Sequence, residues 1–163
     1  MKTLLILRHG KSDWSHLGVP DDDRPLNKRG RRDAPRIGRL LLDEEMVPDL
    51  ILTSPARRAR ETATLVAQAC AFDGEIAVWD ELYPGDPADH LAVLRRQDDT
   101  HRCILLVAHN PGLESLLDLL AGRQRRLPTA ALAQVSLAIR RWSELRPGVT
   151  GELEGVWEPK GLE

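Results

Sequence analysis

The chain of 163 residues is the size of one ordinary domain and is long enough to bury a substantial apolar core. Apolar residues make up 42% and charged residues 29%, a balance that excludes a largely disordered chain. The formal net charge of -2 provides no overall field that would attract nucleic acid or an anionic membrane. We therefore expect a single domain over residues 1–163 with neither kind of partner.

The two cysteines, Cys70 and Cys103, lie far apart and have no C-x-x-C spacing, which excludes a disulfide framework and a zinc site. No stretch approaches the roughly 20 apolar residues of a membrane span, and the first residues show no signal-peptide pattern. We expect two buried thiols and a cytoplasmic location.

The first predicted element is a strand. Four apolar residues, 4–7, run without interruption, which is typical of a strand covered on both faces. The run stops against Arg8, His9 and Gly10, an R-H-G sequence that places a guanidinium and an imidazole at the end of an inner strand.

A polar loop over 10–27 precedes the first helix. Apolar residues at helical spacing predict that helix from about Asn27, which has the right side chain for an N-cap, whereas Pro35 inside the pattern indicates a later start.

The second strand is predicted at 49–53. Ser54 as N-cap and Pro55 as first helical residue then predict a helix that runs to about Cys70. The remaining predicted elements are a weak strand at 76–79, a helix at 89–96, a strand at 103–108 that stops at His109, a helix at 114–120, and two final strands at 134–142 and 152–157. Strands that alternate with helices predict an α/β fold, a three-layer α/β/α sandwich with a mostly parallel central sheet.

Ligands of such sheets collect beyond the carboxyl ends of the parallel strands. The three clearest strands end in polar residues there, so two histidines and at least two arginines are expected to meet. These residues are Arg8 and His9 after the first strand, Arg57 and Arg58 after the second, and His109 after the third.

Arginines beside histidines disfavour a metal site, because guanidinium groups repel a cation and no third histidine or cysteine has suitable spacing. The planar guanidinium grips a phosphoryl dianion well, and a histidine in such a cluster can act as nucleophile. His16, His90 and His101 have no such partners in the sequence and are interpreted as solvated surface residues.

Four segments carry a resemblance to a known family: LLILRHGKS at the N-terminus, DRPLNKRG at 23–30, LILTSPARRARETA at 50–63 and ILLVAHNPGL at 104–113. In these segments and their order, the chain resembles the histidine phosphatase superfamily, which is phosphoglycerate mutase-like. Within it, the chain looks like a SixA-type phosphohistidine phosphatase. The segment 55–108 is too short for a large cap insertion, which disfavours mutase activity. The resemblance implies no cofactor and no metal.

The resemblance also implies roles for individual residues. His9 corresponds to the nucleophile that is transiently phosphorylated, Arg8 and Arg58 to the phosphate-binding arginines, and His109 to the second phosphate-binding histidine, in a protonated form. Arg24 matches a position that can add a phosphate contact. The frame S-P-x-x-R-A selects Arg58 and leaves Arg57 at the surface.

A carboxylate acid that protonates the leaving group would correspond to Glu81, next to Asp80 in VWDELYPG, although an acidic surface loop explains the same residues. A basic nitrogen leaving group needs less help from such an acid. The loop 11–24 is the expected rim of the site, with Trp14 as its anchor rather than as a substrate contact.

Three functions follow. The leading one is a metal-independent phosphatase acting on protein phosphohistidine. The alternative is a phosphomonoesterase of the same superfamily that acts on a small phosphorylated metabolite with Glu81 as general acid. The third is a non-catalytic phosphate-binding module, which would be expected to have lost a core residue, whereas Arg8, His9, Arg58 and His109 are all present.

Overall fold

Strand β1 (Lys2–Arg8) is apolar at four consecutive positions because helices cover both faces of the sheet to which it belongs. Leu4 and Ile6 face one hydrophobic cluster, and Leu5 and Leu7 face the other. The alternation follows from the pleat of a strand, which sends successive side chains to opposite faces. All four side chains are fully buried.

The computed structural model describes residues 1–148 and 151–162. One six-stranded sheet has the order β3-β2-β4-β1-β5-β6. Its first four strands pair in parallel, whereas β5 pairs antiparallel with both β1 and β6. The other strands are β2 (Leu50–Thr53), β3 (Ile76–Val78), β4 (Cys103–Ala108), β5 (Leu132–Leu137) and β6 (Gly151–Trp157).

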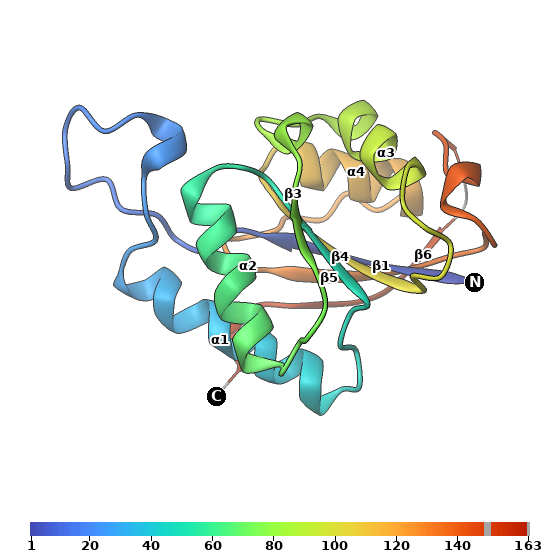
Figure 1. The fold of residues 1–163 in the computed structure, drawn as a ribbon, viewed down its shortest axis with the longest axis horizontal. Coiled ribbons are helices and arrows are strands. Elements are labelled where there is room, and N and C mark those ends of the chain that lie inside the picture. The colour runs from blue at the N-terminus through green and yellow to red at the C-terminus, as the bar shows by residue number, and fades with distance from the viewer. Residues whose placement is uncertain (149–150, 163) are drawn as a thin grey trace.

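Two pairs of helices complete a three-layer α/β/α sandwich (Figure 1). Helices α1 (Lys28–Asp43) and α2 (Arg57–Ala69) cover one face, and α3 (Pro87–Arg95) and α4 (Gly112–Ala121) cover the other. The predicted fold class is confirmed. The blue loop between β1 and α1 projects from the edge of the sheet where β1 ends (Figure 1).

The predicted start of the first helix is confirmed, and that of the second is wrong. Helix α1 begins at Lys28, where the Asn27 side chain caps it by accepting the Gly30 N–H at 2.9 Å, and it contains Pro35 rather than starting later. Helix α2 begins at Arg57 rather than at Pro55, because the backbone of Ala56 is extended and the Ser54 hydroxyl is engaged elsewhere.

Other boundaries and burial predictions also differ. Strand β5 ends at Leu137, so that Trp142 lies in a short 3-10 helix with its ring fully buried. Of the two thiols, Cys70 is buried but Cys103 is only partly so, and burial raises the pKa of Cys103 to about 12.

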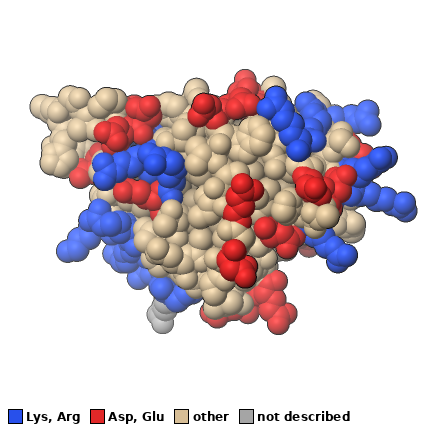
Figure 2. Space-filling model, viewed as in Figure 1, with Lys and Arg blue, Asp and Glu red and all other residues tan. Residues whose placement is uncertain are grey.

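The surface carries both signs of charge. On the face shown in Figure 2, Lys and Arg side chains lie among Asp and Glu side chains. No helix in the described part of the chain is long and apolar enough to cross a bilayer.

The prediction that His90 is a solvated surface residue is wrong. His90, in α3, is completely buried and packs against the backbone of Gly85 and Gly112. Neither ring nitrogen has a hydrogen-bond partner among the described residues. Burial lowers the pKa of His90 to about 4, against the opposing effect of Asp89 and Asp86.

His90 should therefore make the fold acid-sensitive. The unfolded chain binds a proton at this residue below about pH 6.5 and the folded protein only near pH 4, so the free energy of unfolding falls as the pH decreases between these values. His90 alone contributes at most about 1.4 kcal/mol per pH unit to this slope. Urea denaturation across this window should show a smaller pH dependence for His90→Leu. His16→Gln, at an exposed position, is the control; an equal slope in wild type and His90→Leu would contradict the assignment.

Candidate active site

The parallel register of β1 and β4 places two histidines side by side. Arg8 pairs with Ala108, so that His9 and His109 are the next residue on each strand. The His9 N–H donates to the Ala108 carbonyl at 3.2 Å, and the two imidazole centroids lie 4.9 Å apart. Both side chains are buried. The predicted convergence of the strand ends is confirmed.

One nitrogen of His9 is free. The Nδ1 atom lies 2.7 Å from the Gly10 carbonyl oxygen. Because a carbonyl only accepts, Nδ1 carries the proton and Nε2 of the neutral ring has a lone pair. The Gly10 N–H is in turn held by the Thr62 hydroxyl at 3.0 Å, and a Cβ at Gly10 would lie 3.1 Å from the Gly30 Cα. The backbone that orients His9 is therefore fixed by both α1 and α2.

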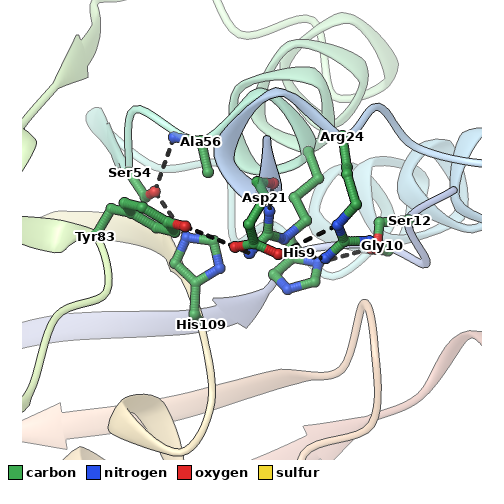
Figure 3. Close-up of polar contacts among 10 residues, drawn as sticks. His9, Gly10, Ser12, Asp21, Arg24, Ser54, Ala56, Tyr83 and His109 are labelled. Carbon is green, nitrogen blue, oxygen red and sulfur yellow. Dashed lines mark hydrogen bonds and ion pairs between the residues drawn. The ribbon is translucent and has the colours of Figure 1, made fainter. Parts of the chain in front are cut away.

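His109 is oriented by Ser54. The Nε2 atom of His109 lies 2.7 Å from the Ser54 Oγ, which accepts the Ala56 N–H at 3.1 Å (Figure 3). We assign the Ser54 hydroxyl as the donor to Nε2, and with that bond the ring proton of neutral His109 lies on Nδ1. This Nδ1 is buried and has no partner among the described residues. His109 thus offers an unused donor.

Two arginines also offer unused donors. Arg8 donates from Nη1 to the Leu127 carbonyl at 3.1 Å, which fixes the guanidinium. The Nε atoms of Arg8 and Arg58 are buried and have no partner within the described part of the chain. Arg57 is exposed and pairs with Glu61 at 3.3 Å, as predicted.

The Asp21 carboxylate joins these groups from the loop between β1 and α1 (Figure 3). Its Oδ1 accepts from Nε and Nη2 of Arg24 at 3.2 and 3.0 Å. Its Oδ2 accepts from Nη2 of Arg58 at 3.1 Å and from the Tyr83 hydroxyl at 2.6 Å. The backbone carbonyl of Asp21 accepts from Nη1 of Arg58 at 2.6 Å. Arg24, proposed from the sequence, reaches the cluster through this carboxylate.

Sequence analysis missed Asp21 and Tyr83. Asp21 stands among three consecutive aspartates that suggest only a polar loop, but its D-x-x-R spacing to Arg24 is a signal for a short turn that brings the two side chains together. Tyr83 lies two residues beyond Glu81. Its ring packs edge-on against His109, with centroids 5.3 Å apart.

Glu81 is engaged in a different contact. Its carboxylate forms an ion pair with the exposed Arg96 at 3.1 Å. The Tyr83 phenol, rather than the Glu81 carboxylate, is the group of this segment that meets the cluster around Asp21.

The loop 11–27 is closed at its base. Ser12 and Leu26 form an antiparallel bridge, and the Asn27 N–H donates to the Lys11 carbonyl at 2.9 Å. Arg24 donates to the Ser12 hydroxyl at 2.5 Å, and the Arg24 guanidinium carbon lies 3.4 Å from the centroid of the Trp14 ring. Trp14 thus stacks on Arg24 but is itself 67% exposed, so its anchoring role stays a prediction.

Burial and positive neighbours keep both imidazoles neutral. Burial, with added repulsion from Arg58, Arg8 and Arg24, lowers the pKa of His9 to about 4. Burial, His9 and Arg58 lower the pKa of His109 to about 3. At pH 7 both imidazoles are therefore neutral, with a lone pair on Nε2 of His9, and the positive charge expected on His109 is absent from the free site.

The remaining charges come from arginine and aspartate. The bonds from Tyr83, Arg24 and Arg58 hold the pKa of Asp21 well below its usual range, so Asp21 is ionised. The bond to Asp21 raises the pKa of Tyr83, which stays protonated. Within residues 1–148 and 151–162, no group of three or more His, Cys, Asp or Glu side chains is placed to hold a metal ion.

A neutral imidazole with a free ring nitrogen, beside arginine donors that have no partner among the described residues, is an arrangement typical of enzymes that act on phosphoryl groups. The model of the histidine phosphatase superfamily (branch 1) matches residues 4–83. An uncharacterized chloroplastic protein of Arabidopsis thaliana is 31% identical over 170 residues, which cover 99% of this chain and 77% of the relative.

Solved structures match the whole fold. The Agrobacterium tumefaciens protein assigned as phosphohistidine phosphatase SixA has a TM-score of 0.83 at 28% identity, covering 97% of this chain and 98% of the other. The protein histidine phosphatase SixA in complex with tungstate has a TM-score of 0.83 at 24% identity and covers 98% of each chain. The chain belongs to the histidine phosphatase superfamily, branch 1, and is a phosphatase without a large cap insertion.

Ser54 should control how His109 binds phosphate. Ser54→Ala removes the donor that holds the Nε2 atom of His109, so the ring is free to take the tautomer with no proton on Nδ1. Loss of one hydrogen bond of this kind should weaken competitive inhibition by inorganic phosphate about 10-fold. Histidine ¹⁵N chemical shifts should report the changed tautomer.

Ser54→Thr, which keeps the hydroxyl, is the matched control and should retain both the tautomer and the phosphate affinity. Unchanged ¹⁵N shifts and inhibition in Ser54→Ala would show that Ser54 does not set the orientation of His109.

Proposed function

We propose that residues 1–163 form a single histidine-phosphatase domain that uses His9 as nucleophile and dephosphorylates protein phosphohistidine without a metal ion. The observation that carries this proposal is the free Nε2 of a neutral, buried His9 next to unpartnered buried donors of Arg8, Arg58 and His109.

In the first step, Nε2 of His9 attacks phosphorus while the bond between phosphorus and the leaving group breaks. Arg8 and Arg58 stabilise charge on the equatorial oxygens, together with the Nδ1–H of His109. The leaving group departs with the electron pair of the broken bond. In the second step, water attacks the phosphorylated His9, the bond between phosphorus and Nε2 breaks, and inorganic phosphate is released.

Three observations favour a phosphohistidine substrate on a protein. The chain has no large cap that would enclose a small metabolite, and the Asp21 side chain beside the buried arginines is half exposed. The structure assigned as phosphohistidine phosphatase SixA aligns with nearly the whole chain. Glu81 pairs with Arg96, and a nitrogen leaving group depends little on a carboxylate acid at this position.

The nucleophile can be tested by rapid-quench release of phosphate from a phosphohistidine-bearing protein domain, with p-nitrophenyl phosphate measured in parallel and EDTA present. His9→Ala should abolish phosphate release from both substrates, whereas EDTA should not change the rate of phosphate release by the wild-type enzyme. His16→Ala, at an exposed histidine, is the control and should match wild type. Release that persists in His9→Ala, or that EDTA stops, would refute the proposed chemistry.

Glu81→Gln separates the proposed function from the small-molecule phosphomonoesterase. Because the Glu81 carboxylate is occupied by Arg96, turnover of both substrates should stay within about 2-fold of wild type, less than one hydrogen bond contributes. A selective loss of p-nitrophenyl phosphate turnover would identify Glu81 as a general acid and favour the alternative.

A further inference from the structure

Asp21 occupies an unusual place for a carboxylate. Its side chain is 50% exposed, whereas the side chains of Arg24 and Arg58 that it binds are 8% and 7% exposed. The carboxylate therefore lies in the outer layer of the site, above buried guanidinium groups. In Figure 3 it stands between the Tyr83 hydroxyl and the Arg24 guanidinium.

A negative charge in this position requires an explanation. The phosphoryl group of a substrate is itself negative, so an ionised Asp21 opposes its binding by direct repulsion. Asp21 has no proton to give at neutral pH, because three hydrogen-bond partners hold its pKa well below the usual range. Asp21 is therefore excluded as a general acid, and a compensating interaction has to come from another part of the substrate.

The leaving group of phosphohistidine can supply that interaction. In a phosphorylated imidazole, one ring nitrogen is bonded to phosphorus and the other can carry a proton, which makes the ring cationic. When the bond between phosphorus and nitrogen breaks, its electron pair stays on the ring, and a neutral imidazole departs with its proton still on the distal nitrogen. No proton transfer from the enzyme is needed. A carboxylate that accepts the distal N–H stabilises the reactive cationic form.

The contacts of Asp21 include one bond that a substrate can replace. Oδ1 is held by Arg24, and Oδ2 is shared by Arg58 and the Tyr83 hydroxyl. Tyr83 is the single neutral donor of the three side chains, and its ring lies against His109, next to the phosphate-binding donors. A cationic N–H is a stronger donor than a phenol, so it can take the place of the Tyr83 hydroxyl on Oδ2.

We propose that Asp21 is a specificity-determining residue, which accepts a hydrogen bond from the distal ring N–H of a phosphorylated imidazole and thereby selects phosphohistidine over phosphate esters. The inference rests on the proposed function, because it assigns a recognition role within the same site. An alkyl or aryl phosphate has neither a positive charge nor an N–H donor in its leaving group, so it gains nothing from Asp21.

The test compares N-phosphoimidazole with p-nitrophenyl phosphate for wild type, Asp21→Asn and Asp21→Glu. Asp21→Asn keeps the size and an acceptor oxygen but removes the charge. The ratio of its kcat/KM for N-phosphoimidazole to its kcat/KM for p-nitrophenyl phosphate should fall about 10- to 100-fold, the range for a hydrogen bond to a charged group. The change in p-nitrophenyl phosphate turnover reports the altered contacts of Arg24 and Arg58 and the lost repulsion, which both substrates share. Asp21→Glu should recover part of the loss.

A third probe, 1-phospho-3-methylimidazolium, separates the hydrogen bond from the charge. It is cationic but has no distal N–H, so the effect of Asp21→Asn should be smaller than for N-phosphoimidazole. An equal effect on the two imidazole probes would overturn the proposed hydrogen bond.

If Asp21 only holds Arg24 and Arg58 in position, the kinetic result will be different. Both N-phosphoimidazole and p-nitrophenyl phosphate would then lose turnover equally in Asp21→Asn, and inhibition by inorganic phosphate would weaken in parallel; this result would overturn the inference and leave the proposed function intact. Wild-type enzyme that hydrolyses p-nitrophenyl phosphate but not N-phosphoimidazole or the phosphohistidine domain would instead refute the proposed function.

Discussion

The parallel pairing of β1 with β4 is the constraint on which the rest of the site depends. It sets His9 and His109 on adjacent strands at the same level, with ring centroids 4.9 Å apart. Two imidazoles so close together, and so near to buried guanidinium groups, are both kept neutral. The sheet thus fixes the position of His9, the proposed nucleophile, and the burial and charge around it keep its ring unprotonated. The same burial has a cost in the free protein, because the Nε atoms of two arginines and the Nδ1 of His109 lack partners among the described residues.

Asp21 reduces the electrostatic cost of burying the arginines of the site. Arg24 and Arg58 are almost completely buried, and a buried charge is unfavourable unless it is paired. One carboxylate serves both, and it lies in the outer layer where water still reaches it. The positive charge of the site is therefore partly offset on its outer side, while the inner donors proposed to bind phosphate have no partner among the described residues.

The sequence predicted the sheet and the ends of its inner strands because a strand buried on both faces leaves an uninterrupted apolar run, as at 4–7 and 103–108. Parallel strand order predicted that His9 and His109 meet an arginine of the 57–58 pair, and the S-P-x-x-R-A frame of the family resemblance selected Arg58 from that pair. Ser54 was misread because a serine before a proline has the local pattern of a helix cap, and only the fold shows that its hydroxyl bonds His109. Asp21 and Tyr83 were missed because they are 62 residues apart and meet only through tertiary structure. His90 was misplaced because polar neighbours in sequence do not reveal the packing of α3 on α4.

The closed base of the loop 11–27 divides the site into two parts with separate structural origins. The bridge between Ser12 and Leu26 anchors the loop independently of its tip, so the segment that carries Asp21 and Arg24 is bounded by fixed ends. The nucleophile and the inner phosphate donors come from strand ends and helix α2, whose positions the hydrophobic core determines. The two parts meet at Asp21, because its carboxylate and its backbone carbonyl both accept hydrogen bonds from Arg58. A change of substrate preference that arises in this short segment therefore has to preserve the position of a buried arginine that belongs to the other part.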